Sequence, residues 1–131
     1  MGMKRIVLVE DDVTLADMYK LKLELDGNEC SVAYDGETGL ALIKAKMPDL
    51  ALLDLMLPQL SGADILKAMR ESDWGKDIKV IMLTNISEAE APEHLFKYKF
   101  ERYIVKANQT LNQVTDIIRD TLEGPETVKT P

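Results

Sequence analysis

The sequence has few of the residues that crosslink domains or bind transition metals. Cys30 is its only cysteine and His94 its only histidine, so an intrachain disulfide and a zinc or copper site both lack their ligands. The longest apolar stretch, from Leu50 to Leu57, is interrupted by Asp54 and falls well short of the roughly 20 apolar residues of a membrane helix. No charged-then-apolar leader precedes Ile6. We therefore expect a soluble, cytoplasmic protein without membrane attachment.

Positive charge is also in the minority. The 131 residues include 16 Lys and Arg against 23 Asp and Glu, a formal net charge of −7, which disfavours a surface built to neutralise nucleic-acid phosphates. We expect no direct nucleic-acid binding by this chain. With 46% apolar and 30% charged residues, the composition fits one globular domain. We place this domain at residues 1–123 and expect residues 124–131, which contain two prolines, to be a flexible tail or the start of a linker.

Apolar runs of strand length alternate with amphipathic segments of helical length along the chain. This alternation predicts a parallel sheet covered by helices on both faces. The second and fifth runs are less apolar and are expected at the edges of the sheet. The five expected strands are residues 4–9, 29–33, 50–53, 78–83 and 102–105.

Four of the five expected helices have recognisable limits. The second is expected over residues 36–46 and the last over 108–123. The third should begin at Ser61, because Asp64 three residues later resembles a capping box. The first should follow Asp12 and share one apolar face made of Leu15, Met18, Leu21 and Leu25.

The fourth helix is expected to be irregular. Pro92 lacks the backbone N–H that a helix begun at Ser87 would need at that position. We therefore expect this helix to start near Pro92 or to be kinked.

Polar side chains stand where the expected strands end. The carboxyl ends of parallel strands share one edge of a sheet, where ligands bind, so these side chains should meet. Four carboxylates against one ammonium give a local charge of −3, which calls for a cation. Oxygen donors alone suit Mg²⁺, with Mn²⁺ as a second possibility. The residues are Glu10, Asp11, Asp12, Asp54, Thr84 and Lys106.

Asp54 ends the central strand and is a candidate covalent nucleophile toward phosphorus. Phosphoryl transfer needs in-line alignment and neutralisation of the equatorial oxygens more than acid or base help. A metal ion, the Lys106 ammonium and the Thr84 hydroxyl could supply both.

Four segments of the chain resemble the signature of response-regulator receiver domains, the CheY-like domains of two-component signalling. They are Val9–Asp12, Pro48–Pro58, Val80–Thr84 and Tyr103–Lys106, and the resemblance covers about residues 4–123. It implies a three-layer, flavodoxin-like (βα)5 fold with a five-stranded parallel sheet in the order 2-1-3-4-5.

The resemblance also implies roles for individual residues. Asp54 would accept a phosphoryl group from a sensor histidine kinase or a histidine phosphotransfer protein. Mg²⁺ would be held by Glu10, Asp11, Asp54 and the backbone carbonyl of Met56. Thr84 and Lys106 would contact the phosphoryl oxygens, and Tyr103 would be the switch aromatic that moves with Thr84. Such a domain is a phosphoacceptor that can catalyse its own phosphorylation and dephosphorylation, not a separate enzyme, and it signals to an output protein or to a C-terminal output domain.

Three positions depart from the family pattern. Ala107 follows Lys106 where the family usually has a proline with a cis bond, so this loop is expected to run differently. Asn85 follows Thr84 where the family favours alanine or glycine, which should narrow access to the site. The basic and aromatic segment Lys97–Arg102 replaces a turn that is usually rich in glycine and acidic residues.

Three other functions compete with this interpretation. Residues 10–14 resemble the D-x-D-x-T loop of haloacid dehalogenase phosphatases, although Glu10 occupies the position of the nucleophile. A flavin or nucleotide binder would share the fold but needs a phosphate loop that is absent after the first strand. A receiver-like interaction module that is not phosphorylated is the third. Incubation with acetyl phosphate and Mg²⁺ discriminates between them.

Overall fold

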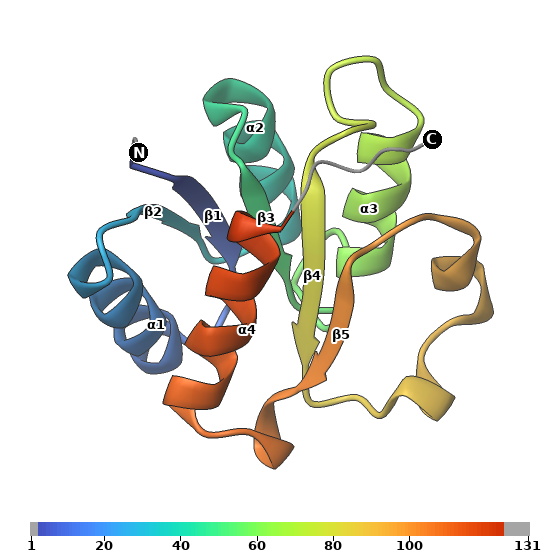
Figure 1. Ribbon diagram of the computed structural model, residues 1–131. Helices are drawn as coiled ribbons and strands as arrows, with labels where there is room; N and C mark the ends of the chain where they lie inside the picture. Colours follow the sequence, from blue (N-terminus) through green and yellow to red (C-terminus); the bar gives the residue numbers. More distant parts are fainter. Residues whose placement is uncertain (1–2, 125–131) are drawn as a thin grey trace.

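The computed structural model describes residues 3–124. Five strands form one parallel sheet in the order β2-β1-β3-β4-β5 (Figure 1), as the resemblance implies. The two less apolar strands lie at the edges, as predicted. The strands are β1 (Arg5–Val9), β2 (Glu29–Ala33), β3 (Leu50–Leu53), β4 (Lys79–Thr84) and β5 (Arg102–Val105).

Four α-helices cover the two faces of the sheet. They are α1 (Val13–Leu25), α2 (Gly36–Lys46), α3 (Gly62–Arg70) and α4 (Leu111–Glu123). Helices α1 and α4 pack on one face, and α2 and α3 on the other (Figure 1). The result is the expected three-layer architecture. Within residues 3–124, no helix combines the length and the apolarity needed to cross a lipid bilayer.

The centre of the sheet is fully enclosed by this arrangement. All four residues of β3 are buried, and so are the last four residues of β1. Strands covered on both faces read as continuous apolar runs, which is why these two strands could be located from the sequence. Because β1 and β3 are held on both faces, the residues directly after their carboxyl ends occupy fixed positions.

Helix α1 presents a different face to the sheet than its leucines suggested. The buried residues are Ala16, Tyr19 and Leu23, whereas Leu21 and Leu25 are 61% and 74% exposed and Met18 is also exposed. The predicted face was therefore wrong, apart from the partly buried Leu15. The helix has two apolar stripes, and its start at the Asp12 cap, directly after the buried strand end, turns the Tyr19 stripe inward.

The expected fourth helix is replaced by two 3₁₀ segments. These are η1 (Glu88–Glu90) and η2 (Glu93–Lys97), so the prediction of five α-helices was wrong at this place. Ala91 is extended, with φ −67° and ψ 151°, because the residue before a proline is driven out of helical geometry. Leu95 of η2 is fully buried beside α3 and completes that face of the core.

The last helix begins three residues later than predicted. Residues Lys106–Asn108 form a third 3₁₀ segment, η3, and α4 starts after Thr110. The Thr110 hydroxyl and the Gln113 side chain cap each other's backbone N–H groups reciprocally, a capping box that fixes this start.

At the opposite edge of the sheet, where strands begin, the turn after α3 carries Trp74. This residue, the only tryptophan of the chain, packs against the core on the α2 and α3 side. It lies near Ile78 and Lys79, at the amino end of β4.

Candidate functional site

The register of the strands brings the predicted site residues to one edge. Val9 of β1 pairs with Leu53 of β3, and Leu53 pairs with Met82 of β4. The residues that follow these pairs, Glu10 and Asp54, therefore leave neighbouring strands side by side. The central carboxylates predicted from the strand exits do converge.

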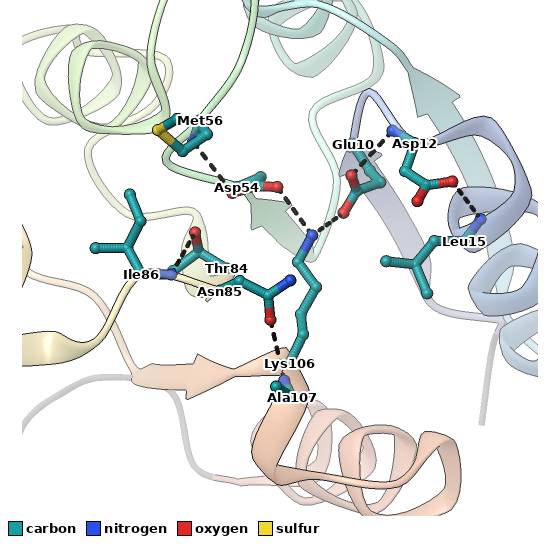
Figure 2. A network of polar contacts seen from close by, with 10 residues as sticks. All are labelled: Glu10, Asp12, Leu15, Asp54, Met56, Thr84, Asn85, Ile86, Lys106 and Ala107. Atoms are coloured by element: carbon teal, nitrogen blue, oxygen red, sulfur yellow. Dashed lines mark hydrogen bonds and ion pairs between the residues drawn. The ribbon is translucent and has the colours of Figure 1, made fainter.

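Glu10 is held on both its backbone and its side chain. Its N–H donates to the carbonyl of Ala33 at 3.0 Å, and its Oε2 accepts from the backbone N–H of Asp12 at 3.0 Å. Asp12 in turn caps α1 by accepting from Leu15 N–H through Oδ1 (Figure 2). The side chain of Asp12 thus serves as a helix cap, and the buried carboxylate is that of Glu10, which is 1% exposed.

Asp54 is seated in a closely packed frame. Its Oδ1 accepts from Met56 N–H at 3.1 Å, and the residue is 6% exposed. The first turn of α3 approaches its backbone so closely that a Cβ built on Gly62 would lie 2.1 Å from the Asp54 carbonyl oxygen. Only glycine fits there, so α3 packs directly against the backbone of Asp54.

Lys106, the first residue after β5, reaches across to both carboxylates. Its ammonium donates to Asp54 Oδ2 at 2.9 Å and forms a very short contact with Glu10 Oε1 (Figure 2). The lysine side chain is only 9% exposed. The ammonium therefore bridges the ends of β1 and β3 from the far strand of the site.

Burial and charge act in opposite directions on these groups. Burial raises the pKa of Glu10, although the hydrogen bond from Lys106 and the one from Asp12 N–H lower it. Burial lowers the pKa of Lys106, but its hydrogen bonds to Glu10 and Asp54 outweigh this, so its pKa is raised. The ammonium is thus fixed in its charged form, whereas the Glu10 carboxylate is under pressure to take up a proton.

The three carboxylates can hold a metal ion. One carboxylate oxygen each from Glu10, Asp11 and Asp54 lie within 4.8 Å of one another. Asp11 is exposed and the other two are buried, so the group opens to solvent on one side. An all-oxygen, multiply anionic donor set suits a hard divalent cation. Nothing in the described contacts places the Met56 carbonyl among the ligands, and its role stays a prediction.

Thr84 and Tyr103 meet at the loop that follows β4. Thr84 is fully buried at the end of β4, and its hydroxyl accepts from Ile86 N–H at 3.4 Å. The Tyr103 hydroxyl, reaching from β5, donates to the Ile86 carbonyl at 2.7 Å and more weakly to that of Ser87. Both side chains therefore hold the same short stretch of backbone.

Two of the departures from the family pattern lie in contact, which was not predicted. Asn85 Oδ1 accepts from the backbone N–H of Ala107 at 3.0 Å (Figure 2). All peptide bonds of the described residues are trans, including the one between Lys106 and Ala107. The sequence did contain a signal for this contact. Asn85 and Ala107 both depart from the family pattern, and they directly follow two site residues, Thr84 and Lys106, that were expected at the ends of neighbouring strands.

The third departure, residues 97–102, leads from η2 into β5. The ring of Phe100 lies between those of Phe96 and Tyr103, at centroid distances of 5.9 and 6.3 Å. Through Phe100, this segment therefore connects the candidate switch residue Tyr103 with Phe96 at the protein surface, which is 47% exposed.

The family of response regulator receiver domains matches residues 6–119 of the chain. The chain belongs to this family. This assignment decides against the haloacid dehalogenase and flavin-binding interpretations. The receiver domain is most simply compared with a CheY-like protein of Methanospirillum hungatei, whose crystal structure shares the fold with a TM-score of 0.84 at 29% identity, covering 93% of this chain and 95% of that one.

Longer proteins are also similar to this receiver domain. The DNA-binding dual master transcriptional regulator RpaA of Synechocystis is 32% identical over 130 residues, 97% of this chain but 54% of RpaA. The chain thus spans about half the length of that relative. The fold is also shared by the receiver domain of the sensor histidine kinase PA1611 of Pseudomonas aeruginosa, with a TM-score of 0.83 at 20% identity, covering 94% of this chain and 100% of that one. That structure has a magnesium ion coordinated in the active site cleft.

Proposed function

We propose that this receiver domain accepts a phosphoryl group on Asp54 from a phosphohistidine of a sensor kinase or phosphotransfer protein. The contact of the Lys106 ammonium with both Asp54 and Glu10 carries the proposal. Asp54 is a buried carboxylate at a strand end, it is paired with a cation that stays charged, and the exposed Asp11 lies beside it. These are the surroundings of a nucleophile toward an anionic group.

The reaction is a single displacement at phosphorus. A carboxylate oxygen of Asp54 forms the new P–O bond while the P–N bond to the donor imidazole breaks, and the electron pair stays on the imidazole nitrogen. Lys106 is charged before the reaction begins. Its ammonium can therefore pass from the Asp54 carboxylate to the incoming phosphoryl oxygens without a proton transfer.

Glu10, Asp11 and Asp54 would hold Mg²⁺, with the Met56 carbonyl as a further oxygen donor. When bound, the ion would neutralise charge on the phosphoryl oxygens. The chain's own contribution is to hold Glu10 through Asp12 N–H and Ala33, so that the carboxylate is ordered before binding. The magnesium in the PA1611 cleft supports this choice of metal by analogy.

Thr84 and Tyr103 would convert phosphorylation into a conformational change. Attraction of the Thr84 hydroxyl to a phosphoryl oxygen would withdraw it from Ile86 N–H. The loop it leaves is the one that the Tyr103 hydroxyl binds. A signal that leaves through this loop and β5 would reach an output protein or an output domain of a longer regulator.

Mass spectrometry of the intact chain after incubation with acetyl phosphate tests the proposal. We expect one added phosphoryl group on the wild type in the presence of Mg²⁺. No group should be added when Mg²⁺ is chelated before incubation, or in Asp54→Asn. Asp17→Asn, at an exposed carboxylate on α1, is the matched control and should be modified like the wild type. Modification that persists in Asp54→Asn, or no modification of the wild type by any phosphodonor, would reject Asp54 as the acceptor and favour an interaction module.

A further inference from the structure

Asn85 occupies a position that no part of the proposed chemistry uses. Thr84 of β4 pairs with Val105 of β5, so Asn85 and Lys106 are the next residues of two neighbouring strands. Asn85 is exposed, whereas Thr84 is fully buried. Asn85 therefore lies on the exposed side of these strand ends, beside the lysine whose ammonium contacts the two carboxylates.

The orientation of the Asn85 amide is set by its partner. A backbone N–H can only donate, so the atom that faces Ala107 must be the carbonyl oxygen Oδ1. The amide nitrogen then points away from Ala107. Figure 2 shows it on the side of the Lys106 chain and the two carboxylates. Within residues 3–124, no hydrogen-bond acceptor is assigned to this nitrogen, and two N–H groups stay available to a ligand.

We propose that Asn85 is a further phosphoryl-contacting residue: the Ala107 N–H fixes Oδ1, and Nδ2 donates a hydrogen bond to an oxygen of the group on Asp54. The inference rests on the proposed function, because it requires a phosphoryl group at that carboxylate. Hydrogen bonds to charged acceptors are the stronger ones. Asn85 would thereby tighten binding of the phosphoryl group at the mouth of the site.

Titration with beryllofluoride, a stable mimic of an acyl phosphate, in the presence of Mg²⁺ tests the inference on the full chain. Asn85→Ala removes both hydrogen bonds and should weaken beryllofluoride binding about tenfold. Asn85→Asp keeps an oxygen for Ala107 N–H but replaces the donor by an anion, so it should bind more weakly still. Mg²⁺ binding without beryllofluoride should change little in Asn85→Ala, because this residue is not one of the carboxylate ligands.

The added charge of Asn85→Asp needs its own control. Ser87→Asp places the same charge two residues away, on an exposed residue whose side chain caps nothing. It should weaken beryllofluoride binding less than Asn85→Asp does. Circular dichroism and the thermal midpoint of Asn85→Asp should match those of the wild type, which separates loss of the donor from loss of the loop.

Ala107→Pro tests the orientation of the amide. It removes the N–H that holds Oδ1, so beryllofluoride should bind more weakly than to the wild type, and adding Asn85→Ala to this variant should have less effect than in the wild-type background. Wild-type affinity in Asn85→Asp would show that the residue only supports the Ala107 turn, and wild-type affinity in Asn85→Ala would show no contact; either overturns the inference. If the proposed function itself fails, the wild type will not bind beryllofluoride at all.

Discussion

The acidic and the donor halves of the site are held in different ways. Glu10 and Asp54 follow two central strands whose last four residues are all buried, and α3 packs against the backbone of Asp54 through Gly62. On the other side, the residues after β4 and β5 enter 3₁₀ segments instead of α-helices. A few side-chain contacts to backbone hold them, chiefly those from Tyr103 and Asn85.

This difference teaches where the domain can move. Displacing Asp54 would require the sheet and α3 to repack, and close-packed interiors resist that. Displacing the loop after Thr84 requires only a few hydrogen bonds to exchange, each worth about 1 kcal/mol. The carboxylates therefore form the fixed reference, and the hydroxyl, amide and ammonium can adjust to a bound group.

Breaking the fixed half should have the largest effect. In Gly62→Ala the new methyl group would collide with the Asp54 carbonyl, so we expect a loss of about 3 kcal/mol in the free energy of unfolding together with loss of phosphorylation. Urea denaturation measures the first effect and acetyl phosphate labelling the second. Gly124→Ala, where the Cβ would lie 3.3 Å from a backbone oxygen, is the milder control. Unchanged stability in Gly62→Ala would contradict the description of a fixed acidic half.

Removing the bridge between the halves should act mainly on chemistry. Lys106→Met leaves Glu10 and Asp54 buried without their cation, and we expect phosphorylation by acetyl phosphate to slow roughly a hundredfold. Thermal unfolding with and without Mg²⁺ gives a second readout, because a bound dication can replace the missing charge. Mg²⁺ should stabilise the variant more than the wild type, and equal stabilisation would count against charge compensation.

A change confined to the adjustable half should be smaller. Tyr103→Phe removes the hydroxyl that binds the Ile86 and Ser87 carbonyls and should lower the free energy of unfolding by about 1 kcal/mol. Hydrogen exchange should accelerate in residues 85–91 and not in β1 or β3. Tyr98→Phe, which removes an exposed contact to Glu71, serves as the control, and faster exchange in β3 of Tyr103→Phe would argue against separate halves.

The smallest expected effect concerns the charge of Glu10 and the pH dependence of the free energy of unfolding. Because burial raises the pKa of Glu10, the folded state holds this proton more tightly than the unfolded state. Its ionisation therefore opposes folding as the pH rises above the ordinary glutamate value. Without metal, Glu10→Gln should therefore gain stability relative to the wild type as the pH rises above the ordinary glutamate value. Denaturation curves across this range test the sign, and a relative loss for Glu10→Gln at neutral pH would reverse it.

The sheet and its acidic edge could be predicted because both depend on local and periodic features. Continuous apolar runs located β1 and β3, and the polar residue directly after each run had to emerge at the common edge. The glycine contact beneath Asp54 could not be found this way. It depends on how α3 docks against β3, which a one-dimensional pattern does not contain.

The errors have physical causes as well. In α1 both Leu21 and Tyr19 belong to apolar stripes, and spacing alone did not decide which of them faces the sheet. Pro92 correctly indicated an irregular fourth segment, because the extended Ala91 before it divides this segment into η1 and η2. The start of α4 lies later than predicted because residues 106–108 form a 3₁₀ segment and the capping box of Thr110 and Gln113 fixes the first α-helical turn after it.

The position of Trp74 has a practical consequence. The chain's only indole lies at the amino ends of the strands, on the side opposite to the carboxylates. Its fluorescence should be blind to metal entering the site, so magnesium titrations need calorimetry or an introduced fluorophore. For the same reason, a change in tryptophan emission upon phosphorylation would report a conformational change that extends from the carboxyl ends of the strands to their amino ends.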